Sequence, residues 1–223
     1  NYKIIEMKKI SIAVSALFIS GLALAQSNTA YTDQNGAGTN TSTVDQIGYA
    51  NYSDVDQTAT NSSYDPNVSD VDQNGDYNNS DVWQNGAGNN LADVDQSGDY
   101  NYSDVQNIGG DNSAYATQVG SFNSASNHQT GDGNSASSNQ VGMGNNSHTD
   151  QYFSFTQYGS NNADYNTATV DQIGDFNTSG VYQKGDYNHA DVDQLGDGNY
   201  SYIYSYGDDN DADVFQRGFT LSS

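Results

Sequence analysis

Along most of the chain, small or aliphatic residues alternate with polar residues in short segments that end at a glutamine. Ser179 and Val181, for example, precede Gln183 at intervals of two residues. Such alternation is typical of a β-strand, because successive side chains of a strand point to opposite faces. Glycine together with Asp, Asn or Tyr lies between these segments and predicts tight connections. The pattern therefore predicts a series of short strands joined by turns.

The segments recur with a fixed period, most regularly between Val170 and Asn199. Gln172, Gln183 and Gln194 stand eleven residues apart, and each is followed by Gly two positions on and Asn five positions on. The repeating unit is Gln-x-Gly-x-x-Asn-x-(Ser/Ala)-x-Val-x-Gln, and a fixed period of this kind indicates a repeat architecture. Roughly sixteen units predict an all-β solenoid of about eight strand-turn-strand rungs, stacked ~4.8 Å apart.

The period also sets the expected domain boundaries. We expect a solenoid over residues 34–216, with an insertion at 58–67 and an irregular unit at 151–166. A short N-terminal segment, 26–33, would precede the solenoid, and a C-terminal tail, 217–223, would follow it. This tail is too short to form an end cap for the stack.

Residues 1–25 carry the pattern of a secretory signal peptide. Met7-Lys8-Lys9 is followed by an apolar run and by the small-residue motif Ala23-Leu24-Ala25, which is the order of charged region, hydrophobic region and cleavage site. Residues 1–6 lie upstream of this start methionine. We expect export and removal of the segment, with no membrane-spanning segment in the mature chain.

The positions that face inward predict ladders of stacked amides. Buried amides without partners are costly, but identical amides stacked in register bond to those above and below. Valines supply the apolar part of the interior, whereas residues 112–151 carry Ala116, Asn127, Ser138 and Thr149 at the valine position, so the middle buries the least apolar surface. The expected ladder glutamines are Gln46, Gln57, Gln73, Gln84, Gln96, Gln118, Gln129, Gln140, Gln172, Gln183, Gln194 and Gln216. The expected ladder asparagines are Asn51, Asn78, Asn101, Asn112, Asn123, Asn134, Asn177, Asn188, Asn199 and Asn210. The expected turn glycines are Gly48, Gly75, Gly86, Gly98, Gly109, Gly120, Gly131, Gly142, Gly174, Gly185, Gly196 and Gly207.

Composition and charge exclude one class of function, nucleic-acid binding, and indicate what would control self-association. The formal net charge is −23, and after the first ten residues only Lys184 and Arg217 are basic, which excludes a basic nucleic-acid-binding surface. Like-charged Asp side chains about 5 Å apart repel by roughly 0.8 kcal/mol per pair in water. Acid, salt or Ca²⁺ should therefore favour association of the chain with itself.

Candidate chemical sites are weak. Asp70-x-Asp72-x-Asn74-Gly75 resembles the start of an EF-hand, but Asp81 stands where the loop needs a bidentate Glu. His128, His148 and His189 fall at different positions of the unit, so we expect no common face to gather them. Because repetition makes the Asp residues equivalent, a catalytic carboxylate pair is not expected either. We predict no enzyme, no cofactor and no metal site.

The unit resembles the curlin repeat of bacterial curli fibres, roughly Ser-x5-Gln-x-Gly-x-x-Asn-x-Ala-x3-Gln. Residues 46–57 (QIGYANYSDVDQ) and 118–125 (QVGSFNSA) match it most clearly. The resemblance implies a secreted, amyloid-forming fibre subunit that polymerises with itself, with a nucleator subunit and a dedicated secretion channel as partners, in a biofilm matrix outside the cell. Two alternatives stay open: a monomeric secreted β-solenoid adhesin or binding module, with or without a response to Ca²⁺, and a minor nucleator subunit.

Overall fold

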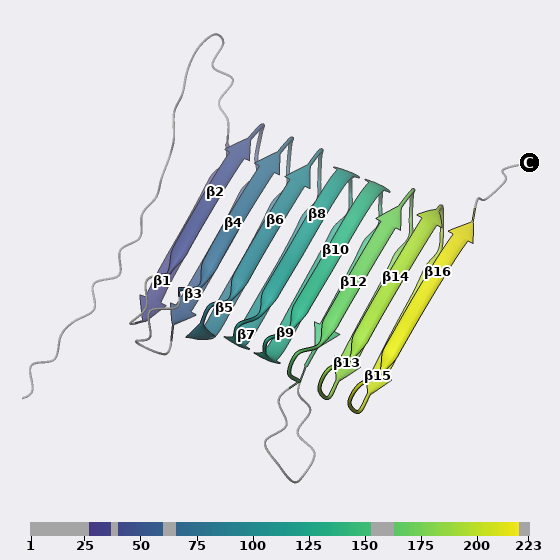
Figure 1. Cartoon of the computed structure of the whole chain (residues 1–223). Coiled ribbons are helices and arrows are strands. Elements are labelled where there is room, and N and C mark those ends of the chain that lie inside the picture. The colour runs from purple at the N-terminus through teal and green to yellow at the C-terminus, as the bar shows by residue number, and fades with distance from the viewer. Residues whose placement is uncertain (1–26, 37–39, 60–65, 153–162, 219–223) are drawn as a thin grey trace, which may run out of the picture.

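The computed structural model describes residues 27–36, 40–59, 66–152 and 163–218, and these residues form sixteen β-strands and no helix (Figure 1). The strands are β1 (Thr29–Gly36), β2 (Thr41–Ile47), β3 (Tyr52–Ala59), β4 (Val68–Asn74), β5 (Asn79–Gly88), β6 (Leu91–Ser97), β7 (Tyr102–Gly110), β8 (Ser113–Ser121), β9 (Ser124–Asp132), β10 (Ser135–Met143), β11 (Asn146–Gln151), β12 (Thr167–Ile173), β13 (Thr178–Lys184), β14 (His189–Gly196), β15 (Tyr200–Tyr206) and β16 (Asp211–Gly218). In this part of the chain, no helix long and apolar enough to cross a membrane was found.

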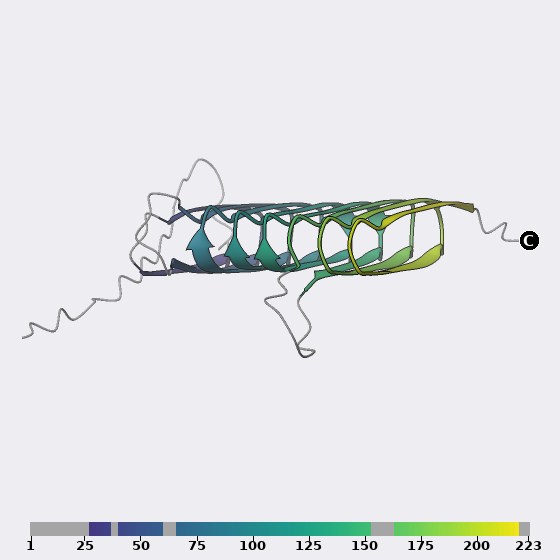
Figure 2. The same cartoon turned by 60° about the horizontal axis from the view of Figure 1, so that its bottom comes forward.

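The strands form two parallel sheets that face each other. Strands with odd numbers, β1 to β15, make one eight-stranded sheet (the odd sheet), and strands with even numbers, β2 to β16, make the other (the even sheet). The chain alternates between the two layers through turns at both sides (Figure 2). One odd and one even strand therefore make one rung, and the predicted all-β solenoid of eight rungs is confirmed.

The predicted limits of the solenoid were too narrow. The first strand begins at Thr29 and pairs with β3 along its whole length, and the last strand ends at Gly218. The reason is that each strand precedes its glutamine, so the segment 26–33 supplies most of the first strand. The predicted signal peptide lies outside the described residues, as do 60–65 of the insertion 58–67 and 153–162 of the irregular unit 151–166.

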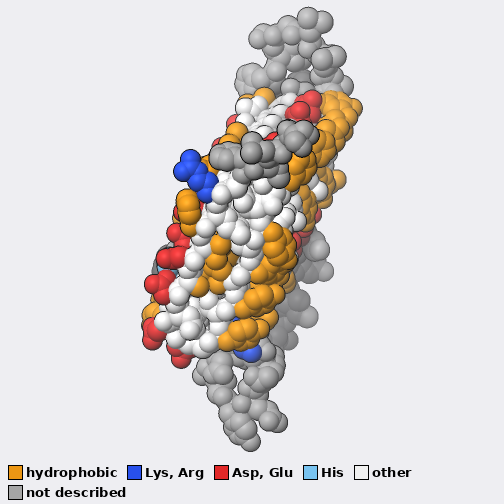
Figure 3. Space-filling model, turned by 90° about the vertical axis from the view of Figure 1, so that its right-hand side faces the viewer, with side chains coloured by type: hydrophobic (Ala, Val, Ile, Leu, Met, Phe, Trp, Pro, Cys, Tyr) orange, Lys and Arg blue, Asp and Glu red, His pale blue; other side chains and the backbone are white. Residues whose placement is uncertain are grey.

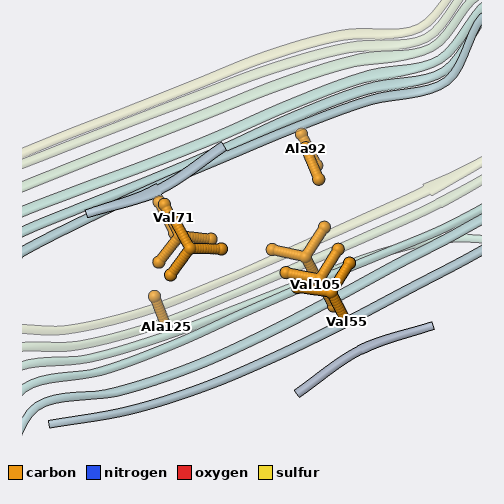
Figure 4. Packing of buried hydrophobic residues seen from close by; sticks show 9 residues of the cluster. Val55, Val71, Ala92, Val105 and Ala125 are labelled. Atoms are coloured by element: carbon orange, nitrogen blue, oxygen red, sulfur yellow. The ribbon is translucent and has the colours of Figure 1, made fainter. Parts of the chain in front are cut away.

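The core lies between the two sheets, and each sheet contributes two inward rows, one at the valine position and one of alanine or serine two residues before it. Val71 and Ala92 of the even sheet point toward Val55, Val105 and Ala125 of the odd sheet (Figure 4). The core valines such as Val55, Val71 and Val105 are fully shielded from solvent. Burying a valine side chain in this way contributes about 1.5–3 kcal/mol to stability.

A polar layer divides this core into two apolar clusters, one in each half of the stack. Asn127 and Ser138 occupy valine positions there, and the Ser138 hydroxyl donates to Asn127 Oδ1 over 2.8 Å. Asn127 Nδ2 in turn donates to the carbonyl of Tyr115, also at 2.8 Å. The buried hydroxyl of Thr149 makes no hydrogen bond. The middle of the described stack thus replaces apolar contact with a small hydrogen-bonded network.

Candidate functional site: amide ladders, outward faces and open ends

Glutamine side chains run through the interior as two hydrogen-bonded ladders, one in each sheet. Gln118 shows the pattern: its Nε2 donates to Oε1 of Gln140 and to the carbonyl of Tyr102 in the opposite sheet, both at 2.9 Å. Its Oε1 accepts from Gln96 Nε2, also at 2.9 Å. An amide with this pattern therefore joins neighbouring rungs and also ties the odd sheet to the even sheet, as Gln46 and Gln57 do in the same way. This satisfies buried polar groups that would otherwise be costly.

Asparagine side chains form a second set of ladders at the turns. Asn101 Nδ2 donates to Asn78 Oδ1 in the rung below (3.1 Å) and to the Gly120 carbonyl in the rung above (2.9 Å). Its Oδ1 accepts from the backbone N–H of Asn123 over 3.1 Å. The asparagine thus holds three successive turns together.

The predicted ladder residues all occupy inward positions of their strands or turns. Those in the interior of the stack are buried, whereas Gln46, Asn199, Asn210 and Gln216 lie near its ends and keep partial exposure. The prediction missed several ladder members that make equivalent hydrogen bonds: Gln34, Gln151, Asn40, Asn67, Asn90, Asn145 and Asn166. A spacing in the sequence identifies the missed asparagines, because the ladder asparagine always lies six residues before the ladder position at the end of its strand.

The predicted turn glycines have positive φ angles with one exception. Gly120 illustrates the need: its φ is +118°, and a Cβ there would meet the Gly142 carbonyl oxygen at 2.0 Å. Gly86 is the exception. An extra residue in β5 shifts the pairing with β7 between Asn85 and Gly88, and Gly88 has the positive φ instead.

One rung interrupts the glutamine ladder of the odd sheet. Asn107 stands opposite Gln84 and Gln129, and its shorter side chain donates only to the Leu91 carbonyl. The Oδ1 of Asn107 and the Oε1 of Gln129 are buried without a hydrogen bond. The odd-sheet glutamine ladder therefore lacks two hydrogen bonds at the rung of Asn107.

Restoring the glutamine should stabilise the protein. We expect Asn107→Gln to raise the free energy of unfolding by about 1–3 kcal/mol, because it adds two buried hydrogen bonds worth about 0.5–1.5 kcal/mol each. Urea unfolding of the monomer, followed by circular dichroism, measures the change. Asn107→Leu adds similar volume without an amide, and an equal gain in that variant would show that the ladder is not the cause.

The outward faces carry rows of aspartate and tyrosine. Asp54, Asp81 and Asp104 lie in register on β3, β5 and β7. Partial burial raises the pKa of Asp81, and repulsion from Asp104 and Asp54 raises it further. Farther along the same face, the ring of Tyr182 stacks on that of Tyr204 with centroids 4.9 Å apart. The rows of aspartates therefore oppose the stacking of rungs on one another, whereas the rows of aromatic rings favour it.

Mild acid should stabilise the stack through these carboxyls. The pKa of Asp81 is higher in the folded chain than in the unfolded one, so the folded state takes up protons first as the pH falls. Stability is then gained from neutral pH down to about 4, the ordinary pKa of aspartate. Urea midpoints across this range should rise, and Asp81→Asn should flatten the rise. Asp211→Asn, at an exposed position with a neighbouring strand on one side, serves as the control. An unchanged slope in Asp81→Asn would contradict this interpretation.

The expectation that no face gathers the histidines was wrong for two of the three. The rings of His128 on β9 and His148 on β11 lie with centroids 5.5 Å apart, and Asp150 contacts both. Hydrogen bonds to Asp104 and Asp150 raise the pKa of His128 to about 9. Burial would raise the pKa of Asp150, but the hydrogen bonds from the two histidines outweigh it and hold that pKa well below its ordinary value. Their positions differ by two along neighbouring strands, which makes them diagonal neighbours on one face.

Both ends of the stack are strand edges. Strands β1 and β2 at one end, and β15 and β16 at the other, have a hydrogen-bonded neighbour on one side only among the described strands. Figure 3 faces the end formed by β15 and β16, where backbone and uncharged polar groups are flanked by hydrophobic side chains on one side and acidic ones on the other. The exposed tyrosines of β15 are Tyr200, Tyr202, Tyr204 and Tyr206. An edge with unpaired N–H and C=O groups is a template for another strand.

Fold and ladders together define a two-sheet parallel β-solenoid whose interior is bonded by stacked, mostly identical amides. The segments 88–120, 164–196 and 188–218 match the family described as the curlin associated repeat. The chain therefore contains curlin associated repeats, and the resemblance inferred from the sequence is confirmed. The comparisons with curated proteins and with solved structures gave no significant match.

Proposed function

We propose that this chain is the structural subunit of an extracellular curli-like amyloid fibre, which grows when the β15–β16 end of one copy adds to the β1–β2 end of the next. The fibre would serve biofilm matrix and surface adhesion. Export by a signal peptide, a dedicated secretion channel and a nucleator subunit belong to this proposal. The observation that carries it is the match between the two ends of the stack.

If the strand register of each sheet continues across such a joint, inward residues of the same type meet in the interior. In the even sheet, Val214 would meet Val44, and Gln216 would meet Gln46 of the next copy. The Gln216 Nε2 now donates to the Tyr200 carbonyl over 2.8 Å. Every other ladder glutamine of this sheet also donates to the Oε1 of the next rung, as Gln194 does to Gln216 at 2.8 Å. The joint would let Gln216 do the same, so the ladder would run on without a break.

Facing side chains on the outward surfaces are also better matched at the joint than between neighbouring rungs of one chain. Within the stack, Asp faces Asp repeatedly, for example Asp33 against Asp56 and Asp45 against Asp72. In the same register, the joint would place Tyr204 over Asp33 and Phe215 over Asp45. No pair of carboxylates would meet there, so addition of a copy avoids the repulsion that the Asp-rich internal rungs carry.

The amide ladders make the joint directional. Glutamine donors point toward the β15–β16 end in every rung that has the ladder, so the two ends differ in donor and acceptor character. An interface between two different ends that does not close into a ring produces an open filament. This geometry favours a fibre over a closed dimer.

Electron microscopy and fibre diffraction of the purified mature protein at neutral pH test the proposal. We expect unbranched filaments with strands perpendicular to the fibre axis and a repeat of about 4.8 Å along it. A protein that stays monomeric at high concentration, in the presence of preformed seeds, would favour the alternative of a monomeric adhesin or binding module.

A further inference from the structure

A compact cluster of two imidazoles and a carboxylate lies on the outward face of the odd sheet. Asp150 sits between the rings, with Oδ1 3.2 Å from His128 Nδ1 and Oδ2 3.0 Å from His148 Nε2. All three residues are partly buried, and one ligand atom of each lies within 4.8 Å of the others. Two histidines and a carboxylate are a donor set that suits Zn²⁺ and related divalent ions of the first transition row.

We propose that His128, His148 and Asp150 form a binding site for a single Zn²⁺ or a chemically similar divalent transition-metal ion. Ligand atoms about 2.0–2.1 Å from a tetrahedral Zn²⁺ lie about 3.3 Å apart. The N···O distances of 3.0 and 3.2 Å, which run to the two different oxygens of Asp150, are close to this spacing, and the three ligand atoms would draw together from within 4.8 Å of one another. The ion would thus take the place of the shared protons with small movements of the side chains.

Asp104 supplies the outer contact that a zinc-binding histidine needs. Its Oδ2 lies 3.1 Å from Nε2 of His128, and the Ser126 hydroxyl lies 3.0 Å from the same nitrogen. When Nε2 donates to Asp104, Nδ1 of His128 is left as the ligand atom, which is the nitrogen facing Asp150. A carboxylate in this position fixes the tautomer and orientation of the ring and strengthens it as a ligand. All three side chains keep some exposure to solvent, so water would reach the fourth position of the ion.

The site joins two rungs at the polar layer of the core. His128 lies on β9 and His148 on β11, and the buried residues of these strands include Asn127 and Thr149 at valine positions. Residues from neighbouring strands bound to one ion are cross-linked, so the metal would add stability where little apolar surface is buried. The expected consequence is a metal-dependent rise in the unfolding midpoint.

Calorimetric titration of the full-length monomer with Zn²⁺, at mildly alkaline pH, measures binding directly. We expect one equivalent per chain, and an absorption spectrum of tetrahedral Co²⁺ when Co²⁺ replaces Zn²⁺. His128→Gln and His148→Gln should each weaken binding at least tenfold, whereas Asp104→Asn should weaken it by about 10–100-fold and keep the stoichiometry. Zn²⁺ should shift the imidazole resonances of His128 and His148 in the wild-type protein, a readout that needs no variant.

His189→Gln is the matched control, because His189 lies with Asp211 and Asp213 in a second, fully exposed cluster. Its Zn²⁺ affinity should equal that of the wild type. Absence of Zn²⁺ binding by the wild type, unchanged affinity in His128→Gln and His148→Gln, or loss confined to His189→Gln would each overturn the proposal.

Discussion

Phe215→Asp should strongly slow fibre growth while leaving the folded monomer intact. Phe215 lies on the end strand β16 and is 69% exposed in the single chain, so its side chain contributes little to the monomer. At the proposed joint, the new carboxylate would face Asp45 of the next copy. Lost apolar burial and added repulsion together cost about 2 kcal/mol per joint, which is roughly a 30-fold weaker association.

Thioflavin kinetics and sedimentation of Phe215→Asp measure this effect. The matched control is Thr169→Asp, which adds the same charge next to Asp191 on the same sheet but in the interior of the stack. Its growth rate should stay close to that of the wild type. The double variant Phe215→Asp with Asp45→Lys should recover growth, because the joint then pairs opposite charges.

The same variant also tests the direction of growth. Its β1–β2 end is unchanged, so it should add to the β15–β16 end of a wild-type fibre and then present a blocked end. Small amounts of Phe215→Asp should therefore slow elongation of wild-type seeds at that end. Normal fibre growth by Phe215→Asp, or an equal defect in Thr169→Asp, would rule out the proposed joint.

Strand content and rung number follow from the sequence because the strand segment has a constant length. From each ladder asparagine to its ladder glutamine the chain advances six residues, as in Asn67 to Gln73 and Asn90 to Gln96. The connection from glutamine to the next asparagine varies, since turns accept extra residues that strands in register cannot. Counting forward from the glutamine therefore selected Gly86 in place of Gly88 and missed Asn67 and Asn166, whereas counting back from the next glutamine finds both asparagines.

Contacts across neighbouring strands are harder to predict from one unit of the repeat. His128 and His148 occupy different positions within their units, and they meet because odd strands stack only on odd strands. Whether the two ends of the stack match also depends on which strands are neighbours and in which register. Phe215 and Asp45 lie at opposite ends of the chain, and their register becomes visible only when the pairing of all eight even strands is known.

Gln118→Leu should cause a large loss of stability in the monomer, because the ladder holds the two sheets together as well as the rungs. Leucine fills a similar volume, so the cavity is small. The Oε1 of Gln140 and the carbonyl of Tyr102 both lose their donor. A buried polar group left without a partner costs about 1–3 kcal/mol, and the expected loss is therefore about 2–5 kcal/mol in the free energy of unfolding.

Urea unfolding monitored by circular dichroism measures the loss against two matched variants. Gln106→Leu changes an outward glutamine whose amide makes long hydrogen bonds to Asp104, at 3.4 and 3.5 Å, and should alter stability by less than about 0.5 kcal/mol.

Gln216→Leu removes the last amide of the even-sheet ladder, where the side chain is partly exposed. It should cost the monomer little but weaken fibre elongation, because the joint loses the Gln216-to-Gln46 bond. A loss in Gln118→Leu no larger than that in Gln106→Leu would show that valine packing, and not the amide ladder, holds the stack together.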